Sequence, residues 1–160
     1  MDFATAVNLL LQHEGGLVDD PNDPGGLTNW GWALHENPDL TADQIRTMTR
    51  DQAIARYKTR FWDRVQGDTL SPAIAFQLFD FAVNAGVGTA IRKAQEIAGV
   101  ADDGNWGPVT AAAVGRLDST QFVARFAAAK IRFYTKLLNW ADSGKGWMLR
   151  IADDIEKGLQ

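Results

Sequence analysis

The stretch FATAVNLLLQHEGG, residues 3–16, joins an apolar helical face to one carboxylate and a glycine pair. Phe3, Val7 and Leu10 recur at helical spacing, which predicts an amphipathic first helix with these side chains in the core. Glu14 is the next residue on the same face, so its carboxyl lies against apolar side chains and loses hydration. Because burial disfavours an ionised carboxyl, the sequence predicts that Glu14 keeps its proton near neutral pH, as a general acid must.

Gly15-Gly16 predicts the end of this helix, because glycine is favourable at left-handed C-terminal positions and poor inside a helix. The missing β-carbons also leave room for a substrate beside Glu14. The alternative is an ordinary surface glutamate, although a carboxylate at a helix C-terminus is mildly unfavourable because of the helix dipole. The local pattern by itself leaves both interpretations open.

A loop with three aspartates, Asp19, Asp20 and Asp23, follows the glycine pair. Its Asp-Pro and Pro-Gly pairs are typical of turns, in which aspartate bonds its own backbone. The spacing does not match a twelve-residue EF-hand loop, so calcium binding is not favoured. Glycoside hydrolysis requires two carboxyl groups on either side of the scissile bond. One of these aspartates is therefore a candidate partner for Glu14.

Several motifs follow one another along the chain. They are EGG at 14–16, NDPGG at 22–26, TNWG at 28–31, YKTRFWD at 57–63, DFAVNAG at 80–86 and DGNWGPVT at 103–110. Together with Trp147 and Arg150 near the C-terminus, this succession resembles glycoside hydrolase family 108, lysozyme-like N-acetylmuramidases that include phage endolysins. The resemblance implies a mostly α, lysozyme-like fold with a glycine-rich active-site loop or small β-ribbon after the first helix.

The resemblance also implies roles for single residues. Glu14 matches the catalytic general acid, and Asp23 and Thr28 lie where related enzymes position or activate water. Asp19 and Asp20 stay open as alternatives for the second carboxylate. No metal and no cofactor are expected.

Four further residues are predicted to bind substrate, namely Trp30, Asn29, Tyr57 and Asn84. Trp30 lies beside the catalytic loop, where an aromatic ring suits the apolar face of a sugar. Asn84 ends the predicted helix after Pro72, where asparagine is a common helix terminator, and the resemblance to the family's central motif implies that it lines the cleft and bonds a sugar amide or hydroxyl. Trp32 stands where the family commonly has a small aliphatic residue, so the rim of the cleft is expected to differ.

Helix signals place the remaining elements. Thr41 and Thr49 each open a capping box, Ser71-Pro72 opens the next helix, and glycines at 144–146 are expected just before the last one. The resemblance implies a lysozyme-like catalytic half over residues 1–87. A helical peptidoglycan-binding half over residues 88–160 is expected to pack into the same compact domain.

Composition narrows the function classes. The 160 residues carry a net charge of −4, which counts against a nucleic-acid partner, and they contain no cysteine for disulfides or thiolate metal sites. No stretch approaches 18 apolar residues, so no membrane insertion is expected. The sequence lacks a signal peptide. It therefore predicts a monomer made in the host cytoplasm that reaches the cell wall, periplasmic or extracellular, through a pore or by lysis.

The predicted function is hydrolysis of the β-1,4 bond between N-acetylmuramic acid and N-acetylglucosamine in peptidoglycan glycan strands, as a bacteriolytic endolysin. Two alternatives remain open at this point. One is a peptidoglycan-binding module without catalysis, and the other is a lytic transglycosylase on the same fold.

Overall fold

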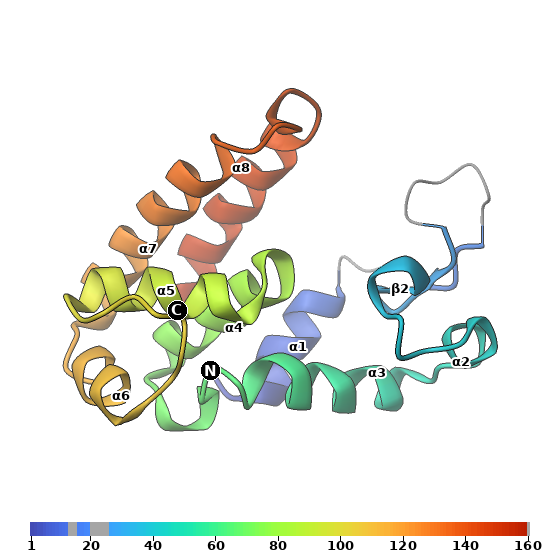
Figure 1. Cartoon of the computed structure of the whole chain (residues 1–160), viewed down its shortest axis with the longest axis horizontal. Coiled ribbons are helices and arrows are strands. Elements are labelled where there is room, and N and C mark those ends of the chain that lie inside the picture. The colour runs from blue at the N-terminus through green and yellow to red at the C-terminus, as the bar shows by residue number, and fades with distance from the viewer. Residues whose placement is uncertain (13–15, 20–25, 160) are drawn as a thin grey trace. The chain divides into compact units, whose positions relative to one another are not determined.

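The computed structural model describes residues 1–12, 16–19 and 26–159 and is mostly helical, with one two-stranded sheet in this part of the chain (Figure 1). The chain divides into two compact units. The hairpin unit is Phe3–Arg60, and the helical unit is Met1–Asp2 with Phe61–Gln160. The predicted mostly α architecture with a small β-ribbon after the first helix is confirmed.

The hairpin unit begins with α1, Phe3–Leu11. Val7 and Leu10 are buried as the spacing predicts, together with Ala6 and Leu11, whereas Phe3 is only partly buried. The sheet consists of β1, Thr28–Asn29, and β2, Trp32–Ala33, paired antiparallel. An isolated bridge between Val18 and Thr28 adds a third segment of extended chain to this ribbon.

The turn of the hairpin consists of Trp30 and Gly31, both with positive φ, at 50° and 79°. Two successive positive φ angles define a type I′ turn, whose twist matches that of the flanking strands. Gly31 adopts this conformation at little cost, whereas Trp30 does so against the preference of a residue with a β-carbon. The structure therefore holds a large aromatic residue in an unfavourable backbone conformation at the tip of the hairpin.

Two short helices complete the hairpin unit. They are α2, Ala42–Arg46, and α3, Arg50–Tyr57, and a 3-10 turn, η1, covers Leu34–Glu36. Both predicted capping boxes are present, since Thr41 and Thr49 accept from the backbone N–H groups of Gln44 and Gln52. The chain continues from α3 into a π-helical turn, η2, Lys58–Trp62.

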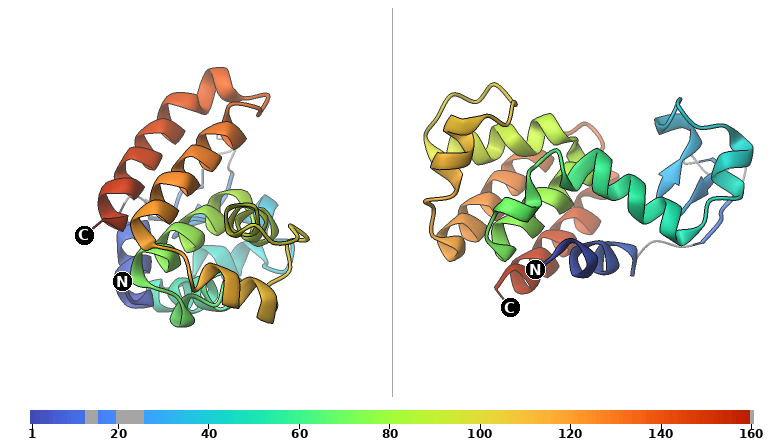
Figure 2. Two further views of the ribbon diagram at one scale, coloured as in Figure 1. Left: turned by 90° about the vertical axis from the view of Figure 1, so that its left-hand side faces the viewer. Right: turned by 90° about the horizontal axis from the view of Figure 1, so that it is seen from below.

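The helical unit contains a short 3-10 turn, η3, Gly67–Thr69, and five α-helices. These are α4, Pro72–Ala85; α5, Val87–Ala98; α6, Pro108–Val114; α7, Ser119–Tyr134; and α8, Trp140–Gly158. The long helices α7 and α8 run side by side (Figures 1 and 2). Every residue of α4 from Ile74 to Ala82 is buried. Helix α4 is therefore the centre of the core.

Aromatic side chains fill this core. The ring of Phe81 meets the rings of Phe126, Phe133 and Tyr134 edge-on, with centroids 5.4 to 5.9 Å apart. Edge-to-face contacts of this kind add to the free energy gained by burying the rings. The pattern fixes α7 against α4 in one register.

Several boundaries in the helical unit agree with the sequence. Helix α4 begins with Pro72 in its first turn, Asp118 caps α7 through Gln121, and Gly99 ends α5 in the left-handed conformation. The predicted division between residues 87 and 88 falls at the start of α5, after its first residue, and α4 and α5 belong to one compact unit. The functional division into two halves stays a prediction.

The predicted start of the last helix is wrong. Helix α8 begins at Trp140, so Gly144 and Gly146 lie inside it. A β-carbon at Gly144 would lie 2.8 Å from the ring of Trp140, whereas one at Gly146 would meet no atom within 4 Å. Gly144 is therefore present for close packing and does not break the helix.

This contrast gives a test within one helix. We expect Gly144→Ala to lower the free energy of unfolding by about 1–3 kcal/mol, because overpacking displaces the Trp140 ring. Gly146→Ala is the matched control and raises it by about 0.5–1 kcal/mol, since alanine favours a helix. Urea denaturation measures both, and equal effects at the two positions contradict the packing role of Gly144.

Candidate active site

The two principal catalytic candidates, Glu14 and Asp23, lie outside the described residues, as does Asp20. The described chain resumes on either side of them, and these flanking segments belong to the hairpin unit. Thr28 opens β1 with a partly buried side chain, whose hydroxyl is 3.5 Å from the carbonyl of Gly26. Asp19, the alternative carboxylate, pairs with Arg46 of α2 at 3.1 Å.

The hairpin is tied to the end of α2 by side-chain hydrogen bonds. Asn29 is buried, and its Nδ2 donates to the carbonyls of Ile45 at 2.9 Å and Met48 at 3.2 Å. Trp30 donates from Nε1 to the same Met48 carbonyl at 3.1 Å. In this conformation the Asn29 amide holds the hairpin in place, and the substrate contact predicted for Asn29 stays a prediction.

Tyr57 of α3 supports the turn from beneath. Its side chain is buried, and its hydroxyl donates to the carbonyl of Trp30 at 3.1 Å. Its ring packs against Trp32, with centroids 4.7 Å apart. The backbone of Trp30 is thus held through its carbonyl, and its side chain through its indole nitrogen. Such external support is what an unfavourable backbone conformation requires, and such conformations are concentrated at functional sites.

Trp32 itself is buried and forms the core of the hairpin unit. The guanidinium of Arg56 lies over its ring, 4.8 Å from the centroid, and that of Arg60 lies 5.8 Å away. Both arginines also bond Asp39, at 2.8 and 3.0 Å. Trp32 is therefore a core residue that packs against Tyr57, Arg56 and Arg60.

The charge cluster around Asp39 is a feature that sequence analysis missed. The hydrogen bond from Arg56 and the nearby positive charges lower the pKa of the Asp39 carboxyl, which is exposed. The cluster joins the chain after β2 to α3, across 17 to 21 residues of sequence. No local spacing marks such a distant pairing, so only the folded chain reveals it.

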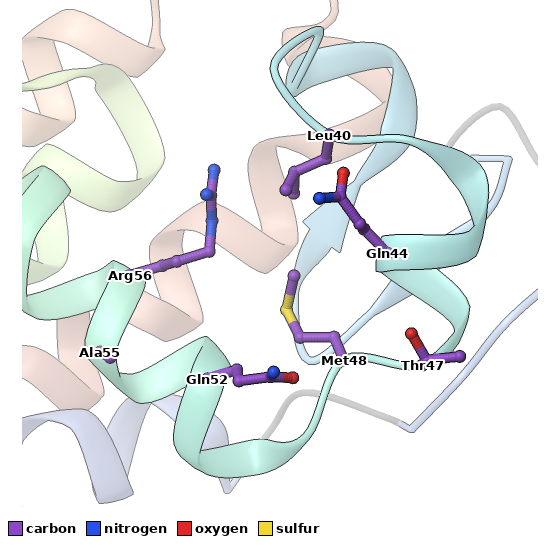
Figure 3. Close-up of a pocket in the computed structure, with 7 residues that line it drawn as sticks. All are labelled: Leu40, Gln44, Thr47, Met48, Gln52, Ala55 and Arg56. Carbon is purple, nitrogen blue, oxygen red and sulfur yellow. The ribbon is translucent and has the colours of Figure 1, made fainter.

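A pocket of about 330 Å³ opens beside these groups in the hairpin unit. Its lining residues are Leu40, Gln44, Thr47, Met48, Gln52, Ala55 and Arg56. Figure 3 shows Met48 between α2 and α3, with Arg56 on one side and Leu40 and Gln44 on the other. The apolar floor and amide-bearing rim are the mixture that suits a sugar ring. Because the Met48 carbonyl accepts from the Trp30 indole, this pocket adjoins the turn of the hairpin.

Asn84, the remaining predicted substrate residue, lies in the helical unit at the end of α4. It is exposed, and its Nδ2 donates to the backbone carbonyl of Asp80 at 2.7 Å. Asp80 belongs to a buried charge cluster with Lys130, Arg150 and Asp154. In the sequence, this cluster is visible only as single charged residues in three separate helices.

The pKa values of the two carboxyl groups in this cluster are shifted in opposite directions. Burial raises the pKa of Asp154 to about 7, aided by the negative charge of Asp80. Burial also opposes ionisation of Asp80, but Lys130 and Arg150 outweigh it and lower its pKa to about 2. Burial and the same acids raise the pKa of Tyr134 to about 12. Asp80 is thus the permanent anion of the cluster.

The described residues contain neither a cluster of metal-binding side chains nor a membrane-spanning helix. No group of three or more histidine, cysteine, aspartate or glutamate side chains among them is arranged to hold a metal ion. None of the helices in the described part of the chain combines the length and apolar character needed to cross a membrane.

The anchoring of the hairpin predicts a stability effect. Asn29→Ala removes the donor to the Ile45 and Met48 carbonyls, so we expect the free energy of unfolding to fall by about 1–3 kcal/mol. Asn139→Ala is the control, because Asn139 precedes α8 without a side-chain cap bond. Urea denaturation compares them, and a loss no larger than that of the control contradicts the anchoring role.

The raised pKa of Asp154 predicts how stability depends on pH. The folded state holds this proton more tightly than the unfolded state, so the stabilisation is complete below about pH 4 and is lost as pH rises towards about 7. Asp154→Asn removes the titrating carboxyl, so the free energy of unfolding of this variant is expected to fall less steeply as the pH rises. Denaturation midpoints at pH 5 and pH 8 measure this change in stability. Asp153→Asn is the control, because Asp153 is exposed. A slope in Asp154→Asn equal to that of the wild type overturns the assignment.

Two comparisons connect this geometry to known proteins. The chain is similar to the solved structure of Brucella abortus SagA, with 30% sequence identity and a TM-score of 0.89, covering 98% of this chain and 93% of that chain. No curated protein matches. The structural likeness confirms the predicted lysozyme-like fold class.

Residues 7–86 match the sequence profile described as Glycosyl hydrolase 108. The matched range ends before residue 88, so the predicted peptidoglycan-binding half stays a prediction. Because the match includes the candidate acid Glu14 and spans half of the 160 residues, the chain belongs to glycoside hydrolase family 108.

Proposed function

We propose that this glycoside hydrolase is an N-acetylmuramidase that cleaves the β-1,4 bond between N-acetylmuramic acid and N-acetylglucosamine in peptidoglycan. The observation that carries the proposal is the family match over residues 7–86, which contains Glu14, Asp23 and Thr28 in one continuous segment. The supported hairpin that begins at Thr28 provides the rigid base that active-site loops need.

In the proposed mechanism Glu14 is the general acid. In its protonated form it donates its proton to the leaving glycosidic oxygen. Asp23, ionised in a polar loop, stabilises the positive charge that develops on the sugar or acts on the attacking water. Thr28 holds that water. Asp23 is preferred to Asp19 as the second carboxylate, because Asp19 already pairs with Arg46.

Some of the proposed substrate-binding residues contact the sugar directly, and others hold a residue that does. Trp30 offers an aromatic ring at the tip of the hairpin, and the pocket beside Met48 offers space for a neighbouring sugar. Asn29 and Tyr57 act in this proposal mainly by holding Trp30 and its turn. Asn84 offers an exposed amide from the helical unit.

The biological setting is also a proposal. The enzyme is taken to be a bacteriolytic monomer of the endolysin type, made in a host cytoplasm and released to the wall through a pore or by lysis. Its partner is the peptidoglycan glycan strand, and neither nucleic acid nor membrane insertion has a part in the proposed action.

The decisive experiment follows new reducing ends released from purified cell walls. Glu14→Gln keeps the shape of the side chain but removes the acid, so the rate is expected to fall by about 10²-fold or more. Asp23→Asn is expected to lose most activity as well. Glu36→Gln is the control, because Glu36 is an exposed carboxylate of the same unit. Wild-type activity in Glu14→Gln contradicts the mechanism.

Mass spectrometry of the released fragments separates the remaining alternatives. Hydrolysis leaves a reducing sugar, a lytic transglycosylase leaves an anhydro sugar, and a binding module without catalysis releases nothing. If only Asp19→Asn or Asp20→Asn loses activity, the second catalytic role belongs to that residue instead of Asp23.

A further inference from the structure

The buried carboxylate of Asp80 orients a cation at the edge of the helical unit. Asp80 is 4% exposed, and both of its oxygens accept from Arg150, with Nε at 3.1 and 3.2 Å and Nη2 at 2.5 Å. Paired contacts of this kind fix the plane of a guanidinium as well as its position. The Arg150 side chain is nevertheless 32% exposed. One edge of the guanidinium is thus held inside, and within the described part of the chain no acceptor bonds its Nη1.

Asn84 is held by the same residue. Its Nδ2 donates to the Asp80 backbone carbonyl at 2.7 Å and lies 3.5 Å from the Asp80 carboxylate. Since the nitrogen faces Asp80, the amide oxygen faces the other way, and no donor among the described residues reaches it. Asn84 and Arg150 therefore present an acceptor and a donor side by side, both fixed through Asp80.

The rest of the cluster makes this edge electropositive. Lys130 and Asp154 pair with each other at 2.7 Å and are almost completely buried. Two acids face two bases, but the raised pKa of Asp154 leaves that carboxyl partly protonated near neutral pH. The cluster then carries a surplus of positive charge, and Arg150 is its cation that reaches solvent. Burying so many charges is costly, and a hydrophobic core of similar volume serves stability equally well.

We propose that Arg150 and Asn84 form a binding pair for the wall polymer, with Asp80 as their positioning residue. Arg150 binds a carboxylate of the polymer through Nη1, and the Asn84 amide oxygen accepts from an acetamido N–H or a hydroxyl. This inference rests on the proposed peptidoglycan substrate. The carboxylate has two chemical sources, the lactyl group of muramic acid residues that carry no peptide and the free carboxyls of the peptide stem.

The test measures binding apart from catalysis. Dissociation constants for purified walls are determined by co-sedimentation in the Glu14→Gln background, where no bond is cleaved. Arg150→Gln is expected to weaken binding about tenfold, the effect of losing one charge-assisted hydrogen bond. Arg132→Gln is the matched control, because Arg132 is exposed on α7 and outside the cluster. Its affinity is expected to equal that of the Glu14→Gln parent.

Chemical modification of the wall distinguishes contact from a structural effect. Walls whose carboxyls have been converted to methylamides are expected to bind the parent about tenfold more weakly, and Arg150→Gln is expected to bind native and amidated walls alike. If the losses from Arg150→Gln and amidation multiply, or if Arg150→Gln binds native walls like the parent, the proposal is overturned. A glycan stripped of peptide by an amidase identifies the source, since only the lactyl carboxylate remains on it.

Two further variants test the positioning role. Arg150→Lys keeps the charge but loses the paired geometry, so it is expected to recover only part of the affinity. Asp80→Asn is expected to weaken binding to the level of Arg150→Gln, and the double variant shows no further loss. Wild-type affinity in a folded Asp80→Asn contradicts positioning. The outcomes stay separate from the proposed function, because failure of that function appears as an absence of new reducing ends from the wild-type enzyme.

Discussion

The backbone carbonyl of Met48 is the acceptor on which the hairpin unit depends. It receives the amide of Asn29 and the indole N–H of Trp30, one from the strand and one from the turn. A two-stranded ribbon of this size is marginally stable by itself in water. Because its two anchors meet at the chain between α2 and α3, the ribbon has a fixed register and a fixed tip. Tyr57 completes the support from α3.

This support explains why a tryptophan occupies a position where glycine is easier. Trp30 lies at a φ of 50° in the turn, and three interactions, through its indole, its carbonyl and the neighbouring Asn29, hold it there. The strain is compensated by groups that are themselves buried. An aromatic ring held in this way has little conformational freedom left to lose on binding, which suits the proposed role of Trp30 in substrate contact.

The helical unit contains a buried, ionised carboxylate in an otherwise aromatic core. Its core is built from aromatic rings around α4, and yet Asp80 on that helix is ionised and almost fully buried. Bonds from Arg150 and the nearby Lys130 stabilise the charge, and the backbone carbonyl of Asp80 accepts the Asn84 amide at the end of α4.

The sequence by itself determined the local features of this protein. Capping boxes at Thr41 and Thr49, the proline start of α4 and the apolar face of α1 depend on neighbours a few residues apart, and these predictions are confirmed. The motifs from residue 14 to residue 86 also determined the family. Only the tertiary structure decided that Gly144 lies inside α8, that Asn29 anchors the hairpin, and that Asp80 gathers charges from distant helices. The roles of Asn29 and Asp80 depend on contacts between residues far apart in the chain, which no local spacing encodes. At Gly144 the ring of Trp140, four residues earlier in α8, fills the space of a β-carbon, and this became visible only once the start of the helix was known.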